Sequence, residues 1–368
     1  MQKYGFLKEI KCILLAAGYG SRWEPLTKVI PKSCLPFLNI PFIEHLLWYL
    51  HYWKIEEIYV NLFHRSSSVK ELLQNYSQEY EFYFSEEQKL LGTAGGVKKI
   101  FALFGESPAL IINSDSFSPV PLPKLFTYHS ACNADLTLCL KIAKESLPYT
   151  KIFIDPDNRI SFTPDATMHK KTFFFSGCYM LSPAILTPIP ENVFADMTGD
   201  VIQSCMHNHK IMAFILKKWW VDIGTPKNYL LATKYFLSKV VKCKSSLPWL
   251  PANFLYQQTL RTHGDTIILL GKGTKVKTDQ IHGANVVGQK CYIAAEACLR
   301  NCVLLEESYV SSYARLRNCI IGPFVKVPAH AHYHNKLVVS LSWLASHDVY
   351  LPATKTREDE GNIVVDIC

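Results

Sequence analysis

The sequence, 368 residues long, lacks several features that would restrict its function. No apolar run approaches the roughly 18 residues that a membrane helix needs, and no charged segment precedes a cleavable apolar stretch. We therefore expect a cytoplasmic protein that does not bind membranes. The 12 cysteines include no Cys-x-x-Cys pair. Buried, hydrophobic thiols are favoured over zinc ligands for this reason.

Concentrated charge is also missing. The net charge is +8, but the basic residues are scattered, without an arginine-rich stretch or a stripe of cations and aromatics. Proteins that bind nucleic acid usually show such a cluster, so no nucleic-acid partner is expected. A moderate basic excess suits phosphorylated small molecules better.

Both common glycine-rich nucleotide signatures are incomplete. Trp23 stands where a Rossmann fingerprint has its third glycine, and no Gly-Lys-Ser/Thr completes a Walker loop. Instead, a short apolar strand is followed by Gly18 and Gly20, whose backbone N–H groups can cradle an anion. Arg22 comes next and Lys32 lies ten residues further. This combination predicts a polyphosphate site, and an ordinary strand-turn-helix with surface cations is the alternative.

Apolar runs typical of strands alternate with helical patterns from residue 8 to about 240. The strand-like and helical segments together are, in order, Ile10–Ala17, Ile43–Trp53, Glu57–Leu62, Ser68–Tyr76, Glu81–Phe84 and Ala109–Asn113. This alternation predicts an α/β domain over 8–240, in which helices flank a parallel sheet. Ligands then belong at the carboxyl ends of the strands, where Gly18 and Asp115 fall. A linker is expected over 241–265.

A different rhythm begins after the linker. Val287, Ile293 and Leu299 fall six residues apart, and Arg-Asn-Cys recurs at 300–302 and 317–319. Such repetition predicts a short solenoid over 266–335, in which parallel strands on three faces bury one another's apolar rows. Residues 336–368 are expected to form a C-terminal extension.

Six further motifs accompany the glycine loop in a fixed order. They are Leu35-Pro36, Pro41-Phe-Ile43-Glu44, Gly92-Thr-Ala-Gly-Gly96, Asn113-Ser-Asp115, Phe175-Ser-Gly177 and Trp220-Val-Asp-Ile-Gly-Thr-Pro226. Together with the loop they resemble the sugar-1-phosphate nucleotidylyltransferases, in particular the mannose-1-phosphate guanylyltransferases. The resemblance implies a Rossmann-like nucleotidyltransferase domain with a mixed sheet, then a left-handed parallel β-helix. It also implies a homo-oligomer formed through the β-helix.

The resemblance implies that a sugar-1-phosphate attacks the α-phosphorus of a nucleoside triphosphate and releases pyrophosphate, with Mg²⁺ as cofactor. Arg22 would stabilise the developing charge and Lys32 would contact phosphate. Asp115 and Asp222 would bind the metal. Ser176 and Gly177 would bind the sugar. The expected nucleotide-binding residues are Ala16, Ala17, Gly18, Gly20, Ser21, Glu87, Gly92, Thr93 and Gly95.

Some alternatives stay open. Thr93 could simply cap a helix, and the carboxylate of Glu87 could accept hydrogen bonds from guanine or from uracil. Ser161-Phe-Thr-Pro-Asp165 stands where many mannose and glucose enzymes have Glu-Lys-Pro, so Lys170 or Lys171 would have to supply the phosphate-binding lysine. Phe-Ser-Gly without Glu-Lys-Pro is closer to uridylyltransferases acting on N-acetylmuramate-1-phosphate. A catalytically silent subunit that binds nucleotide-sugar and a bifunctional acyltransferase are alternatives of other classes.

Overall fold

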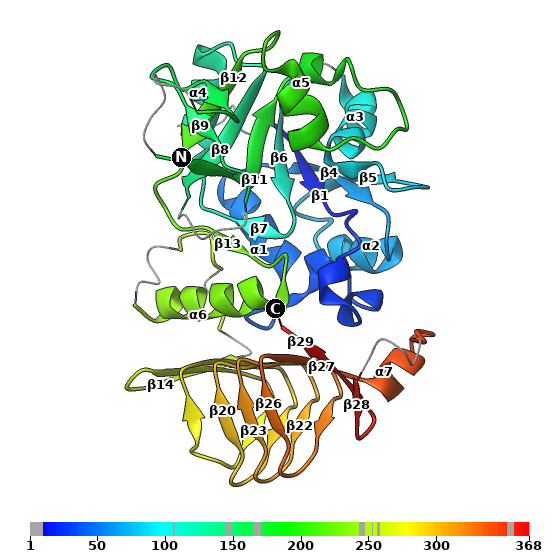
Figure 1. The fold of residues 1–368 in the computed structure, drawn as a ribbon, viewed down its shortest axis with the longest axis vertical. Helices are drawn as coiled ribbons and strands as arrows, with labels where there is room; N and C mark the ends of the chain where they lie inside the picture. Colours follow the sequence, from blue (N-terminus) through cyan, green and yellow to red (C-terminus); the bar gives the residue numbers. More distant parts are fainter. Residues whose placement is uncertain are drawn as a thin grey trace. The chain divides into compact units, whose positions relative to one another are not determined.

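The computed structural model describes residues 10–105, 107–143, 149–164, 171–242, 247–251, 253–255, 258–351 and 357–367. The chain forms two compact units, each of which combines two stretches of sequence (Figure 1). Unit 1 contains Met1–Tyr19 and Tyr49–Val221, and unit 2 contains Gly20–Trp48 and Asp222–Cys368. None of the helices in the described ranges is both long and apolar enough to span a bilayer.

Unit 1 is built on a seven-stranded mixed sheet in the order β12-β8-β11-β6-β1-β4-β5. Strand β1 is parallel to β4 and β6, whereas β11 is antiparallel to β6 and β8. The mixed sheet implied by the family resemblance is therefore confirmed. The parallel sheet predicted from the alternation is wrong, because β11 runs antiparallel to both of its neighbours. The strands are β1 (Lys11–Leu15), β4 (Glu57–Leu62), β5 (Glu81–Glu86), β6 (Ala109–Asn113), β8 (Leu136–Ile142), β11 (Phe173–Leu181) and β12 (Ile211–Ile215).

Helices cover this sheet because their apolar residues recur on one face. In α3 (Gly92–Phe104), the buried residues Ala94, Val97 and Phe101 lie three and four positions apart, and the helix packs on β1, β4 and β5. Helix α4 (Leu122–Ala131) packs on β11 and β12. The other elements of this unit are α2 (Ser66–Gln74), β7 (Ser116–Phe117), β9 (Phe153–Ile154), β10 (Ile160–Ser161), η5 (Pro183–Leu186), η6 (Met197–Ile202) and α5 (Gln203–Cys205).

The first part of unit 2 is held by aromatic side chains. Phe37 is completely buried, with its ring edge-on to those of Phe42 and Phe236. Tyr229 on α6 (Pro226–Lys242) joins this cluster and donates a hydrogen bond from its hydroxyl to the carbonyl of Pro36. The remaining elements are η2 (Ser21–Trp23), η3 (Leu26–Lys28), η4 (Lys32–Cys34), β2 (Pro36–Phe37) and β3 (Ile40–Pro41). Helix α1 (Phe42–Tyr52) runs from unit 2 into unit 1, and β13 (Val221–Asp222) spans the other boundary.

The rest of unit 2 is the expected left-handed β-helix, which is confirmed. Three stacks of short strands form its faces: β15-β18-β21-β24-β27, β16-β19-β22-β25 and β17-β20-β23-β26 (Figure 1). Ile293 pairs with Val310 and Val310 pairs with Val327, all three fully buried, so one coil takes 17 residues. The coil is thus one residue shorter than three regular hexapeptides.

The strands of the β-helix are β15 (Thr266–Gly271), β16 (Lys275–Val276), β17 (Ile281–His282), β18 (Ala284–Val287), β19 (Tyr292–Ile293), β20 (Cys298–Arg300), β21 (Val303–Leu304), β22 (Tyr309–Val310), β23 (Arg315–Arg317), β24 (Ile320–Ile321), β25 (Lys326–Val327), β26 (His332–His334) and β27 (Lys336–Ser340). Antiparallel strands cover both of its ends. These are β14 (Gln258–His263) at one end, and β29 (Asn362–Asp366) with β28 (Arg357–Asp359) at the other, where α7 (Leu341–Ala345) also lies. Covered ends stop other chains from pairing with open strand edges.

The same corner of three successive coils carries an asparagine in the left-handed conformation. Asn301, Asn318 and Asn335 have φ of 53°, 50° and 54°. Their side chains form a ladder: Asn301 Nδ2 donates to Asn318 Oδ1 (3.4 Å), and Asn318 Nδ2 donates to Asn335 Oδ1 (3.0 Å). Asparagine tolerates this backbone better than other residues with a side chain, which explains the repeated Arg-Asn-Cys motif.

We expect Asn318→Ala to lower the free energy of unfolding by about 2–3 kcal/mol. The estimate combines about 1 kcal/mol for alanine in the left-handed region with about 1 kcal/mol for each lost hydrogen bond. Chemical denaturation would measure it, with Lys326→Ala as control because Lys326 is exposed on β25. Equal stability of the two variants would contradict the role given to the ladder.

Candidate active site

The glycine loop begins where β1 ends. Ala16 is buried and its N–H donates to Asn61 Oδ1 at 2.7 Å, whereas Gly18 is exposed. Gly20 has φ 66°, and a Cβ there would lie 2.9 Å from Thr27 Cγ2. Its carbonyl accepts hydrogen bonds from Trp23 N (2.8 Å) and Thr27 Oγ1 (2.8 Å). The turn therefore requires glycine at position 20.

Trp23 anchors the cationic part of the loop. It is 1% exposed, and its ring lies edge-on to that of Tyr229, with 5.1 Å between the ring centroids. Its Nε1 donates a hydrogen bond to the carbonyl of Ile223 at 2.8 Å. A large side chain thus stands where a Rossmann loop has glycine, and it ties the loop to the residue after Asp222. Ser21 and Arg22, beside this anchor, are exposed.

Asp222 is held with a defined orientation at the end of β13. Its Oδ1 accepts the N–H of Gly224 (2.5 Å), and its Oδ2 accepts Asn228 Nδ2 (2.7 Å). Lys32 is half-buried in η4, and its Cβ would lie 3.2 Å from a Cβ at Gly20. Unit 2 therefore carries Gly20, Arg22, Lys32 and Asp222, with Trp23 linking the loop to the Asp222 segment.

In unit 1, the glycines at the start of α3 allow another backbone to approach closely. A Cβ at Gly92 would lie 2.5 Å from the carbonyl oxygen of Ala195, and one at Gly95 would lie 2.6 Å from that of Val193. The carbonyl of Ala195 also accepts the N–H groups of Ala94 (2.9 Å) and Gly95 (3.3 Å). The start of this helix is thus fixed by residues 193–195.

Thr93 connects the same two segments and does not cap the helix. Its Oγ1 donates to Asp196 Oδ1 (3.0 Å) and accepts the N–H of Met197 (2.8 Å). The N-cap position is Leu91, without a capping side chain, so the capping interpretation of Thr93 is wrong. The hydroxyl is used for tertiary contact because the segment at Asp196 lies beside the helix.

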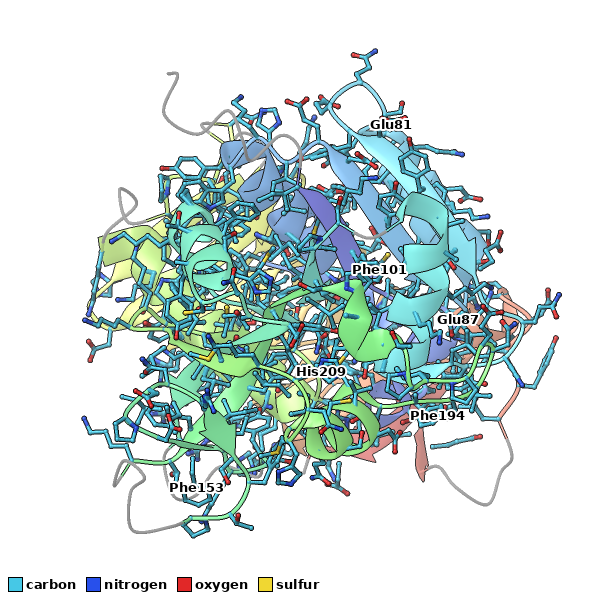
Figure 2. The ribbon with its side chains drawn as sticks, turned by 90° about the horizontal axis from the view of Figure 1, so that it is seen from above. Glu81, Glu87, Phe101, Phe153, Phe194 and His209 are labelled. Carbon is cyan, nitrogen blue, oxygen red and sulfur yellow. The ribbon has the colours of Figure 1, made fainter. Side chains whose placement is uncertain are left out.

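Glu87 is 6% exposed, and both of its oxygens accept hydrogen bonds from the protein. Oε1 accepts Asn61 Nδ2 (3.0 Å) and Oε2 accepts the N–H of Leu91 (2.8 Å). Burial raises the pKa of this carboxyl, and the two hydrogen bonds oppose the shift. Glu87 thus contacts Leu91, and the ring of Phe194 approaches the next residue, Gly92. Glu87 and Phe194 are both labelled in Figure 2, and the Phe194 side chain is exposed.

Asp115 lies just after β6 and is half-buried. The preceding residue, Ser114, donates from both its N–H (3.1 Å) and its Oγ (2.6 Å) to the carbonyl of Leu15 at the end of β1. The ends of β1 and β6 are thereby held together, as expected for the carboxyl edge of a parallel pair.

The segment around Ser176 and Gly177 is a β-bulge in β11. The pairing of β11 with β8 shifts register between Phe175 and Tyr179. The carbonyl of Ser176 accepts Ser116 Oγ (3.1 Å) and Trp220 Nε1 (2.8 Å). The Ser176 hydroxyl is buried and has no hydrogen-bond partner among the described residues. Bulges often aim side chains at functional sites, and an unsatisfied buried hydroxyl favours a polar ligand.

We expect Gly177→Ala to destabilise the protein by about 1–3 kcal/mol, as overpacked sites do, and to lower activity with it. Gly177 has φ 86°, and its new Cβ would lie 2.2 Å from Ser116 Oγ. When Ser116→Ala is added, the midpoint of thermal unfolding should rise and activity should increase, because that change removes the clashing atom. Gly199→Ala is the control, since the nearest described atom to a Cβ at Gly199 is Asp196 Oδ2, at 3.9 Å. Unchanged activity in Gly177→Ala would contradict a role for the bulge.

Each predicted site residue has a place in one unit. Unit 1 carries Ala16, Ala17, Gly18, Glu87, Gly92, Thr93, Gly95, Asp115, Ser176 and Gly177, and unit 2 carries Gly20, Ser21, Arg22, Lys32 and Asp222. Lys171 is exposed, and Lys170 lies outside the described residues. In the described ranges, no three His, Cys, Asp or Glu side chains gather as a metal site.

Three residues that hold site residues in place were not predicted from the sequence: Asn61, Trp220 and Asp196. Asn61 gave a signal, since it is a lone amide in the apolar run Glu57–Leu62. Trp220 was quoted only as part of a motif. Asp196 gave no signal, because its contacts join segments about a hundred residues apart.

Comparison with known proteins gives matches over both parts of the chain. The family model described as "Nucleotidyl transferase" matches residues 11–239, and the model described as "GlmU-like, C-terminal hexapeptide" matches residues 250–333.

Two relatives illustrate the similarity. The D-glycero-alpha-D-manno-heptose 1-phosphate guanylyltransferase of Aneurinibacillus thermoaerophilus is 29% identical over 225 residues, which are 61% of this chain and 97% of that protein. The mannose-1-phosphate guanyltransferase of Schizosaccharomyces pombe is 28% identical over 247 residues, 65% of this chain and 67% of that protein.

Among solved structures, HddC from Yersinia pseudotuberculosis complexed with GMP-PN shares the fold. The match has a TM-score of 0.53 at 24% identity and covers 62% of this chain and 99% of that chain. The family model spans more than half of the sequence and includes every candidate site residue. This chain belongs to the nucleotidyl transferase family.

Proposed function

We propose that the protein is a sugar-1-phosphate guanylyltransferase, which joins GTP and mannose-1-phosphate or a related sugar-1-phosphate into a GDP-sugar and releases pyrophosphate. The observation that carries the proposal is the presence of Arg22, Lys32, Asp115 and Asp222, one set of phosphate- and metal-binding side chains, in a chain of this family. A silent subunit would be expected to have lost at least one of them.

The proposed chemistry depends on alignment and charge. The phosphate oxygen of the sugar-1-phosphate attacks the α-phosphorus, and the bond from that phosphorus to the pyrophosphate leaving group breaks. In the proposal, backbone N–H groups near Gly18 and Gly20 bind the triphosphate. Arg22 and Lys32 neutralise the charge that develops on the leaving group. No protein nucleophile is required.

Mg²⁺ is the proposed cofactor. Asp115 and Asp222 offer hard carboxylate oxygens, and magnesium is usually held by one or two carboxylates together with phosphates and water. The orientation of the Asp222 carboxylate by Gly224 and Asn228 fits this use. A bound ion would neutralise phosphate charge. EDTA should therefore abolish activity, and excess Mg²⁺ should restore it.

The names of the relatives favour GTP over UTP. On the sugar side, the buried Ser176 hydroxyl without a partner supports a polar group of the substrate near the bulge in β11. The missing Glu-Lys-Pro keeps a uridylyltransferase for N-acetylmuramate-1-phosphate as the second candidate.

The test is pyrophosphate release with Mg²⁺ for GTP, UTP, dTTP, ATP and CTP against mannose-, heptose-, N-acetylhexosamine- and N-acetylmuramate-1-phosphates. The proposal expects release from GTP with mannose- or heptose-1-phosphate, abolished by Asp115→Asn. Release from UTP with N-acetylmuramate-1-phosphate would replace the proposal by the second candidate. If no substrate pair releases pyrophosphate but the protein still binds GDP-mannose, the result would indicate a regulatory subunit.

A further inference from the structure

A buried hydrogen-bonded chain links the glycine loop to the start of α3, and Asn61 lies at its centre. Asn61 is 2% exposed on β4, beside Leu15 of β1. Its Oδ1 accepts the N–H of Ala16 at 2.7 Å, and its Nδ2 donates to Glu87 Oε1 at 3.0 Å. Glu87 Oε2 continues the chain by accepting the N–H of Leu91 at 2.8 Å. All of these residues lie in unit 1.

Gly96 makes room for this chain. A Cβ at Gly96 would lie 2.7 Å from Asn61 Nδ2 and 2.8 Å from Glu87 Oε1, too close for any side chain. The second glycine of the Gly-Gly pair in α3 is thus explained by the contact between Asn61 and Glu87. The polar pair and the glycine therefore form one packed arrangement.

We infer that Asn61 is a positioning residue: it fixes the loop at Ala16–Gly18 and the carboxylate of Glu87 in the geometry that binds the nucleotide. The inference deepens the proposed function and rests on it. Ala16 lies two residues before Gly18, and Leu91 directly precedes Gly92, so these hydrogen bonds set the position of both segments. An amide suits this role because it accepts on one side and donates on the other. Removing one partner of such a buried hydrogen bond is destabilising, because the remaining donor or acceptor is left unsatisfied.

The sharpest test exchanges donor and acceptor between positions 61 and 87. In Asn61→Asp, a carboxylate faces the carboxylate of Glu87, and in Glu87→Gln, an amide N–H₂ faces the N–H₂ of Asn61. Each single variant should bind GTP at least about tenfold more weakly, since a buried contact is broken. In the double variant, the new amide donates to the new carboxylate, and the N–H groups of Ala16 and Leu91 keep their acceptors. The double variant should bind GTP more tightly than Glu87→Gln alone, because both lack the Glu87 carboxylate and only the double variant restores the contact between positions 61 and 87.

Binding of GTP would be measured by calorimetry, and KM for GTP and for mannose-1-phosphate in the transfer assay. A positioning role predicts that KM for GTP rises while KM for mannose-1-phosphate stays the same. Thr137→Val is the matched control. It breaks an equally buried side-chain hydrogen bond, 2.8 Å to His129 Nδ1, in the same unit and away from the loop. It should lower thermal stability without changing either KM.

The inference and the proposed function fail in different ways. If the wild type binds GTP but transfers nothing, the proposed function fails, and the binding data still test Asn61. If the single variants bind GTP as well as the wild type, or the double variant recovers thermal stability without affinity, the positioning role is overturned. A wild type that binds no nucleotide overturns both.

Discussion

Arg22→Ala should lower kcat roughly a hundred- to a thousand-fold, the usual loss when one charge-stabilising donor is removed from a transfer site. The midpoint of thermal unfolding should hardly change, because Arg22 is exposed. KM for the nucleotide should rise much less than kcat falls, since the guanidinium is expected to act on charge that develops as pyrophosphate leaves. Steady-state kinetics with GTP and mannose-1-phosphate would measure both constants.

Arg315→Ala is the matched control for this prediction. Arg315 is also an exposed arginine, but it lies on β23 of the β-helix. Its removal changes the net charge by the same amount and should leave kcat unchanged. Equal losses in both variants would point to a general effect of charge and would contradict the role given to Arg22.

Trp23→Ala should lower the free energy of unfolding by about 3–5 kcal/mol, as expected for loss of a completely buried aromatic side chain. Activity should fall further than stability alone explains, because Trp23 holds the loop of Arg22 against the Ile223 segment. Denaturant unfolding and kinetics below the unfolding transition would separate the two effects.

Two further variants make this prediction specific. Trp23→Phe keeps an aromatic ring beside Tyr229 but leaves the Ile223 carbonyl without its donor, at a cost of about 1–3 kcal/mol. It should retain more activity than Trp23→Ala. Trp343→Ala removes another buried indole from the same unit, in α7 after the β-helix, and should destabilise the protein without lowering kcat of the remaining folded enzyme. Wild-type kinetics in Trp23→Ala would contradict the anchoring role.

Local patterns in the sequence were enough to predict the main elements. The apolar run Glu57–Leu62 is β4, and the run Ala109–Asn113 is β6. Val287, Ile293 and Leu299, predicted as inward-facing residues, are completely buried in the β-helix. Period and composition suffice in these cases because each element buries its own apolar residues.

The contacts that fix the site could not be predicted, because they join distant parts of the chain. The alternative interpretation of Thr93 as a helix cap is wrong because the segment at Asp196 lies close enough to accept a hydrogen bond from its hydroxyl. Trp23 was noted only as a departure from a glycine pattern; its value as an anchor depends on Ile223, two hundred residues later. No local propensity contains such information.

Clustering of charge also depends on the fold. The basic residues are scattered along the sequence, yet Arg300 and Arg317 are register partners on β20 and β23, with Arg315 two residues from Arg317. All three side chains are exposed. The 17-residue coil gathers them on one face because it returns the chain to the same position at each turn. A reading of the sequence alone does not reveal this.

Transfer of an α-phosphorus label is the most direct test of the central claim. The protein would be incubated with [α-³²P]GTP, mannose-1-phosphate and Mg²⁺, and the products separated. We predict that the label appears in GDP-mannose and that the pyrophosphate released is unlabelled, because the sugar phosphate attacks the α-phosphorus. Label that stays in GTP for all sugar-1-phosphates tested, in a protein that binds GDP-mannose, would contradict the account.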